Sequence, residues 1–156
     1  VLCGAPEGDR ADWLVEKLAE LGIGRFQPVD TARGRWRRAS GRRERWERLA
    51  VAALRQSRRV HLMAVGDPLP LEHALRELPE GCSRWLADAS GGWLAHGAPG
   101  RGTTAVGLVG PASGLSGEER DAAMRAGFVP LRLSDGRLRT ETAALAWAFW
   151  WAGGAA

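Results

Sequence analysis

The chain has 156 residues, a length typical of one domain, and its 22 basic against 18 acidic residues give a formal net charge of +4. Its longest apolar run is too short to span a membrane and no signal peptide is visible, so we expect a soluble cytoplasmic protein. The two cysteines and three histidines lack metal-ligand spacing, so neither a metal site nor a structural disulfide is predicted.

The first half of the chain predicts alternating helices and strands. Apolar residues recur at helical spacing before Gly22 and again around Trp46, whereas shorter apolar runs without that spacing predict strands. The elements expected here are a helix from Asp9 or Asp12 to Leu21, a strand over 26–29, an arginine-rich loop over 33–40, a helix over 42–57, a strand over 60–65 and a helix over 71–78.

The second half continues this alternation. Ser116 and Glu119 have the spacing of a capping box and predict the start of a helix. The elements expected here are a strand over 84–88 ending in a loop over 89–92, a turn over 99–102, a strand over 105–109, a helix from Ser116 to about Ala126, a strand over 128–133, a turn at 135–136 and a helix over 143–151. Such alternation predicts an α/β fold with a parallel sheet flanked by helices.

Two segments near the C-terminus are the candidates for a ligand site. The first, 110–116, contains glycines and follows the strand over 105–109, so its backbone can approach a ligand closely. The second, 138–143, precedes the last helix and offers threonine hydroxyls as donors and caps. Together the two loops could form one small-molecule pocket, whereas Gly110-Pro111 alone could equally be a turn that ends a strand.

These segments carry a resemblance to a known family. Gly110-Pro111-x-x-Gly114-Leu115-Ser116-x-x-Glu119, followed by Leu138-Arg139-Thr140-Glu141-Thr142-Ala143, resembles the SPOUT-class methyltransferases that methylate N3 of a uridine in 16S ribosomal RNA, the RsmE type. Upstream, 17–33 resembles the family's Lys-x-x-Glu-Leu-Gly…Pro…Thr-Glu-Arg segment, and 45–59 resembles its Arg-Trp…Ala…Gln-x-x-Arg helix. The motifs keep their order from about Asp9 to Ala148.

The resemblance implies a fold, a reaction and partners. The fold is the SPOUT fold with its C-terminal trefoil knot, and the reaction is S-adenosylmethionine-dependent methylation of uridine N3 in small-subunit ribosomal RNA. The family's members are homodimers with the knot at the interface. We expect residues 1–156 to form the methyltransferase domain alone, without the small β-barrel RNA-binding domain that usually precedes it in the family.

The resemblance also implies that the cofactor lies between three loops of the knot. The residues expected to bind S-adenosylmethionine are Leu86, Gly110, Pro111, Gly114, Leu133, Leu138 and Thr142. No histidine falls in these loops, so no general base is evident. Arg139 could bind either the anion of uracil or an RNA phosphate through its guanidinium, and stabilisation of the uracil anion makes it the candidate catalytic residue. Glu141, at a helix start, is expected to complement the helix dipole.

Four loop positions depart from the family pattern. Ala112 and Ser113 stand where the family has glutamate and glycine, and Ser134 and Gly136 stand where it has glycine and arginine. If either replaced glycine required a positive φ, the serine would add strain of about 1–2 kcal/mol. Two hypotheses therefore stay open: an active ribosomal RNA methyltransferase, or a non-catalytic SPOUT relative that binds RNA or a nucleotide without methyl transfer.

Arginines concentrate between residues 33 and 48, where eight of them accompany two glutamates and two tryptophans, Trp36 and Trp46. Arginine binds phosphate in a bidentate manner and stacks on bases. The residues expected to bind RNA are Arg33, Arg42, Arg43 and Arg59. The alternative is a solvated helix face over a core Trp46. The chain has a single lysine, which suggests GC-rich coding DNA, and such DNA raises the arginine content whatever the function.

The last expected helix is apolar on every side. Residues 143–151 contain no polar side chain, and consecutive helix positions point about 100° apart, so some must face away from the domain's own core. An exposed apolar patch of this kind is rare in monomers. A helix buried in a homodimer explains this composition, and simple core packing is the alternative.

Overall fold

Parallel strand pairing organises the chain. The computed structural model describes residues 1–37, 41–93 and 104–153. In these ranges the strands are β1 (Leu2–Cys3), β2 (Arg25–Asp30), β3 (Ala64–Val65), β4 (Leu69–Pro70), β5 (Ser83–Trp93), β6 (Ala105–Val109) and β7 (Val129–Arg132). They form one sheet in the order β3-β2-β1-β6-β5-β7, with β4 also pairing with β2, and every strand pair is parallel. The predicted α/β architecture is confirmed.

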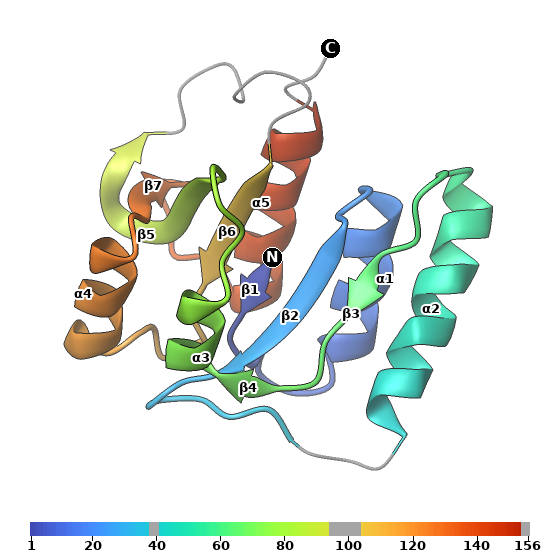
Figure 1. Cartoon of the computed structure of the whole chain (residues 1–156), viewed down its shortest axis with the longest axis horizontal. Helices are drawn as coiled ribbons and strands as arrows, with labels where there is room; N and C mark the ends of the chain where they lie inside the picture. The colour runs from blue at the N-terminus through green and yellow to red at the C-terminus, as the bar shows by residue number, and fades with distance from the viewer. Residues whose placement is uncertain (38–40, 94–103, 154–156) are drawn as a thin grey trace.

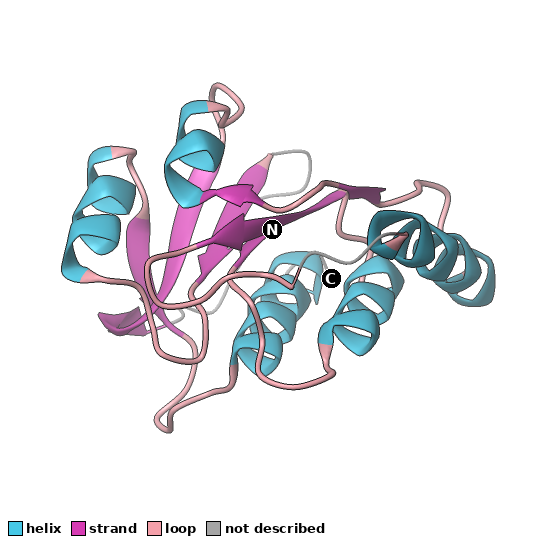
Figure 2. Ribbon diagram, turned by 90° about the horizontal axis from the view of Figure 1, so that it is seen from below, coloured by secondary structure: helices cyan, strands magenta, loops and turns pink. Residues whose placement is uncertain are grey.

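Helices cover both faces of the sheet, so the fold has three layers (Figure 2). The helices are α1 (Ala11–Glu20), α2 (Arg42–Ser57), α3 (Leu71–Arg76), α4 (Gly117–Arg125) and α5 (Thr140–Gly153). Figure 1 shows α3 and α4 at one end of the sheet and α1 and α2 at the other. One apolar cluster, which includes Phe26 and Trp46, packs under α1, α2 and α5, and a second, which includes Leu86 and Phe128, packs under α3 and α4.

The contact between α5 and the sheet depends on a glycine. A Cβ atom on Gly107 in β6 would lie 2.5 Å from Cε2 of Trp147, so only a residue without a side chain lets the indole ring rest on the strand. Trp147 is 2% exposed, and its ring stacks on Trp151 with 6.1 Å between centroids. The apolar helix is therefore buried in part within the domain itself.

Most predicted elements are present, with shifted ends. The capping box of Ser116 and Glu119 starts α4 as predicted, and Gly22, at a φ of 81°, ends α1. Neither predicted aspartate caps α1, because Arg10 occupies the N-cap position without a side-chain bond. Asp12 instead accepts hydrogen bonds from Arg45 and Trp46.

Two predicted segments differ from the structure. The strand expected over 60–65 is reduced to β3, because Val60 and Leu62 are 85% and 52% exposed and bury nothing. The loop expected over 89–92 belongs instead to β5, which has a register shift and continues beside β7 to Trp93. The turn predicted over 99–102 lies outside the described residues, and the trefoil knot stays a prediction.

None of the helices in the described ranges is long and apolar enough to cross a membrane.

Candidate functional site

A cavity of about 580 Å³ lies at the carboxyl ends of β6 and β7, beside the register shift in β5. In parallel α/β sheets this edge is where ligands bind, because the loops after neighbouring strands meet there. Two such loops, after β6 and β7, and the middle of β5 line it, with Arg120 of α4 and Thr140 and Ala143 of α5. The lining residues are Leu86, Ala87, Asp88 and Ala89 of β5, Val109 at the end of β6 with Gly110, Pro111, Ala112, Gly114 and Leu115 after it, and Leu133, Ser134, Asp135, Gly136, Arg137 and Leu138 after β7.

Six of the seven residues expected to bind the cofactor line this cavity. They are Leu86, Gly110, Pro111, Gly114, Leu133 and Leu138. The seventh, Thr142, has an exposed side chain outside the cavity, and Thr140 lies in the cavity wall instead. The physical reason is helix geometry: α5 begins at Thr140, so Thr142 points about 200° away from it.

The loop after β6 is held in a single tight conformation. Gly114 has a φ of 75°, which favours glycine, and its N–H donates to the carbonyl oxygen of Pro111 at 2.8 Å. Two other glycines pack directly against Pro111, since a Cβ on Gly4 would lie 2.7 Å from its Cδ and a Cβ on Gly34 would lie 2.6 Å from its Cβ. The loops after β1 and β2 thus support the cavity wall from behind.

The serines that replace family glycines are not strained. Neither Ser113 nor Ser134 has a positive φ, so the strain considered from the sequence does not arise. Ser113 Oγ donates to the carbonyl oxygen of Arg33 at 2.9 Å, and Ser134 Oγ accepts from the N–H of Gly136 at 3.2 Å. Both serines therefore add hydrogen bonds that hold the loops.

The other two departures lie on facing loops. Ala112 and Gly136 stand where the family has glutamate and arginine, and Arg137, next to Gly136, donates from Nη2 to the carbonyl oxygen of Ala112 at 2.6 Å. The two loops thus remain joined through an arginine, although the side chain and the backbone acceptor are not those of the family pattern.

A polar wall of the cavity was missed by the sequence reasoning. Asp88 Oδ2 accepts from Nε of Arg120 at 2.7 Å, while Asp88 Oδ1 accepts from both the N–H and the Oγ of Ser90. Burial disfavours the charged carboxyl, but the bonds from Ser90 and Arg120 outweigh that effect and hold the pKa of Asp88 below its usual value. No motif marks these residues, because β5 and α4 bring them together over 30 residues of chain.

The candidate catalytic residue lies at the edge of the cavity. Arg139 is exposed and does not line the cavity, but its neighbours Leu138 and Thr140 both do. Glu141 lies in the first turn of α5, as the dipole interpretation requires, and is 3% exposed.

One of the four expected RNA-binding arginines contacts the site. Arg33 donates from Nη1 to the carbonyl oxygen of Leu115 at 3.3 Å. The others lie toward α2 and have partners there: Arg42 lies over the Trp46 ring, Arg43 bonds to Glu47 and Asp67, and Arg59 donates to the carbonyl oxygen of Glu20. The structure therefore does not bring the four together.

The two tryptophans among these arginines belong to the core. Trp46 is 1% exposed and Trp36 is 4% exposed, and their rings meet edge to face with Phe26. Trp36 also donates from Nε1 to the carbonyl oxygen of Cys3 at 3.0 Å. Neither ring is free to stack on a base, so the core interpretation of Trp46 is confirmed and extends to Trp36.

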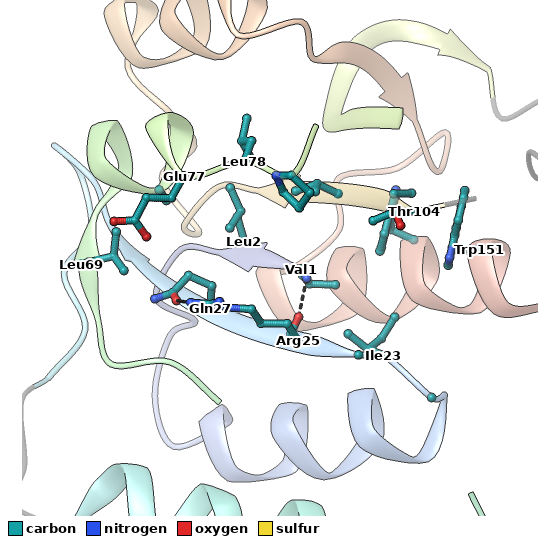
Figure 3. A pocket seen from close by; sticks show the side chains of 17 residues that line it. Val1, Leu2, Ile23, Arg25, Gln27, Leu69, Glu77, Leu78, Thr104 and Trp151 are labelled. Atoms are coloured by element: carbon teal, nitrogen blue, oxygen red, sulfur yellow. Dashed lines mark hydrogen bonds between the residues drawn. The ribbon is translucent and has the colours of Figure 1, made fainter. Parts of the chain in front are cut away.

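A second cavity, of about 410 Å³, lies at the opposite, amino-terminal edge of the sheet (Figure 3). Its lining is mostly apolar, with Leu2, Ile23 and Trp151 among the walls. The Gln27 amide there donates to the carbonyl oxygens of Pro28 and Asp67, and so is already paired. Gly22 and Gly24 line this cavity, but no residue of the loops after β6 and β7 does.

In the described parts of the chain, no group of three or more His, Cys, Asp or Glu side chains is arranged to hold a metal ion.

Comparison with known proteins points to one family. The family model for an RNA methyltransferase domain matches residues 1–152. The ribosomal RNA small subunit methyltransferase E of Bacillus subtilis is 28% identical over 158 residues, which cover 93% of this chain and 61% of that protein. The protein of the same name from Aquifex aeolicus is 29% identical over 134 residues, covering 85% of this chain and 58% of the relative.

A solved structure agrees. The crystal structure of a ribosomal RNA small subunit methyltransferase E from Neisseria gonorrhoeae, bound to S-adenosylmethionine, matches with a TM-score of 0.83 and 30% identity. The match covers 94% of this chain and 62% of the other. The chain thus spans less than two thirds of the length of these relatives.

Proposed function

This chain belongs to the RNA methyltransferase domain family, and we propose that it binds S-adenosylmethionine and methylates N3 of a uridine in small-subunit ribosomal RNA. The relatives named as small subunit methyltransferases support the substrate, and the related structure bound to S-adenosylmethionine supports the cofactor. The observation that carries the proposal is that the middle of β5 and the loops after β6 and β7 line one cavity of about 580 Å³. Such an enzyme works in the cytoplasm, where ribosomal RNA is processed.

The residues of the cavity fit this cofactor. Its volume of about 580 Å³ is within the usual range of small-molecule sites, roughly 300–1,000 Å³. Leu133 and Leu138 offer an apolar surface to an adenine ring, and the glycine-containing loop after β6 brings backbone groups near it, whereas Leu86 is 1% exposed and packs in the core behind the wall. Asp88 and Arg120 supply charge on another wall. S-adenosylmethionine, when bound, supplies an electrophilic methyl group on a sulfonium.

The chain's own residues would then prepare the uridine. N3 of uracil must lose its proton before it can attack, which places negative charge on the ring. Arg139, exposed beside the cavity-lining Leu138, is the group we propose to stabilise that charge, since a guanidinium keeps its own positive charge throughout. Arg33, which holds the loop after β6, is the arginine we propose to contact the RNA backbone beside the site.

We further propose a homodimer and the knot as parts of this function. Phe149 on α5 is 67% exposed, although Ala144, Trp147 and Ala148 of the same helix are buried in the domain. An interface over this face of α5 would cover Phe149 and bring a second copy near the cavity, where α5 begins.

A methyl-transfer assay tests the proposal. Small ribosomal subunits lacking the modification are incubated with the protein and S-adenosylmethionine carrying a labelled methyl group, and the digested RNA is analysed by mass spectrometry. Labelled 3-methyluridine at one position is the expected product. Incorporation at another atom would correct the target, and no incorporation despite cofactor binding would favour the non-catalytic alternative.

That alternative rests on specific residues. Ala112 and Gly136 remove a carboxylate and a guanidinium that the family pattern has in the two ligand loops, and no histidine in these loops can act as a base. A protein of this kind would bind the cofactor or RNA and transfer nothing.

A further inference from the structure

The ion pair between Asp88 and Arg120 has an unusual position. Both side chains line the cavity, and they are 20% and 40% exposed. Among the ion pairs of the described residues, no other side chain is as buried as that of Asp88. Partial burial of a charged pair has an energetic cost unless its hydrogen bonds are satisfied. The pair therefore calls for a reason beyond a solvated surface contact.

Four hydrogen bonds fix the orientation of the pair. Asp88 is saturated by Ser90 on one oxygen and by Arg120 Nε on the other, and Arg120 Nη2 also donates to Ser90 Oγ at 2.8 Å. A guanidinium has five N–H donors. Two of those of Arg120 are used here, so three, including both on Nη1, have no partner among the described residues. The cavity is thus lined by a guanidinium held by one edge with the rest of its donors free.

The free donors suit a carboxylate. Arginine binds a carboxylate through two parallel N–H···O bonds, which are stronger than bonds between neutral groups. The methionine end of S-adenosylmethionine carries such a carboxylate next to an ammonium group, and this charge cannot be buried against apolar residues without partners. It must therefore lie at a polar wall of the cavity.

The other charged side chains of the cavity are less suitable. Asp135 has the wrong sign and is 88% exposed. Arg137 is exposed, and its Nη2 is bonded to the carbonyl oxygen of Ala112. Arg120 is left as the partly buried cation with a fixed orientation.

We propose that Arg120 binds the carboxylate of the methionine end of S-adenosylmethionine, with Asp88 and Ser90 as the residues that position it. This assignment rests on the proposed function. It places the adenosine end against the apolar surface of Leu133 and Leu138, away from the ion pair. The wall of β5 and α4 then selects for the amino-acid part of the cofactor.

Three ligands test this assignment by calorimetric titration. S-adenosylhomocysteine has the carboxylate, decarboxylated S-adenosylmethionine keeps the amino group and the sulfonium without the carboxylate, and 5′-methylthioadenosine lacks the whole amino-acid end. The substitution Arg120→Gln should weaken the binding of S-adenosylhomocysteine about tenfold to a hundredfold, as expected for the loss of charged hydrogen bonds. The dissociation constants of the other two ligands should change by less than about twofold. Arg120→Lys, which keeps the charge without the fork, should give an intermediate loss.

Two further variants complete the design. Arg125→Gln removes an exposed arginine from the same helix, outside the cavity, and should leave all three affinities unchanged. Asp88→Asn should reproduce the selective loss of S-adenosylhomocysteine, because a merely structural role would weaken all three ligands together. Thermal unfolding of each variant checks that the fold is kept, and Arg120→Lys remains the test if Arg120→Gln does not fold.

The outcomes are distinct. If Arg120→Gln and Arg120→Lys weakened the binding of all three ligands equally, the assignment would be overturned, since Arg120 would then affect only the shape of the cavity. Unchanged S-adenosylhomocysteine affinity with lost RNA methylation would also overturn it and assign Arg120 to the RNA. If the unmodified protein bound none of the ligands, the proposed function itself would fail, and the assignment with it.

Discussion

Thr140 Oγ1 donates a hydrogen bond to the carbonyl oxygen of Gly110 at 3.1 Å and so joins the first turn of α5 to the end of β6. Thr140 is 4% exposed, and water therefore has little access to this bond. The two loops that form opposite walls of the cavity meet at these residues. This buried hydroxyl and the bond from Arg137 to Ala112 together hold the two loops at a fixed separation.

Replacing Thr140 by valine should weaken both the fold and the site. The change keeps the shape of the side chain but leaves the Gly110 oxygen without its donor, which costs about 1–3 kcal/mol of unfolding free energy. Thr142→Val is the matched control, because its exposed side chain should change that free energy by less than about 0.5 kcal/mol. Urea unfolding measures both, and an equal effect of the two variants would contradict the role given to Thr140.

Gly107 should tolerate no side chain. Alanine there would press its methyl group into the Trp147 ring, and overpacking of this kind costs about 1–3 kcal/mol. Gly117→Ala is the control, since a Cβ at this first position of α4 meets nothing within 4 Å. The melting temperature should fall for Gly107→Ala and stay level or rise for Gly117→Ala, and the reverse order would refute the packing described for α5.

Arg33 should contribute more to RNA binding than Arg43 does. Each phosphate contact adds about 0.7–0.9 to the slope of log affinity against log salt, so Arg33→Glu should flatten that slope by about one such contact. Arg43 is already paired with Glu47 and Asp67, and its reversal should change the slope less. Fluorescence anisotropy with a 16S ribosomal RNA fragment measures both slopes. A larger effect of Arg43→Glu would indicate that the RNA-binding surface lies on α2 instead.

Phe149→Glu should convert a dimer into monomers. Trp150 meets Trp85 edge to face at 5.4 Å and Trp151 stacks on Trp147, so charged residues at those positions would damage the domain as well as an interface. Phe149, 67% exposed, avoids this ambiguity. Light scattering at tens of micromolar protein should give the dimer mass for the unmodified chain and half of it for the variant. A monomeric unmodified chain would rule out the proposed dimer.

Periodic elements of this fold could be predicted from the sequence, and irregular ones could not. The helix over Arg42–Ser57 has the predicted ends, because its apolar positions repeat at helical spacing. Two-residue strands such as β1 and β4 have no period to detect. The bend of β5 depends on Gly91, where a Cβ would lie 2.5 Å from the Leu131 nitrogen, and no local pattern reveals that contact.

In the candidate site too, some parts could be predicted from the sequence and others could not. The loops that bear Gly110, Gly114 and Leu138 could be predicted from motifs, because each loop is a short continuous segment and its glycines can be recognised in the sequence. The helix phase that selects Thr140 over Thr142 depends on where α5 starts, which boundary signals indicate only within a few residues. Arg120 meets Asp88 only through packing of α4 beside β5, and pairs at that separation leave no sequence signal.

Binding of S-adenosylmethionine tests the central claim most directly. Calorimetric titration of the unmodified protein should give one site per chain, with a dissociation constant well below about 1 mM, on the scale of ordinary cofactor sites. Gly114→Val should abolish this binding, because a branched residue at a φ of 75° strains the loop after β6. Undetectable binding by the unmodified protein at millimolar ligand, with the fold intact by circular dichroism, would contradict the claim that this cavity is a cofactor site.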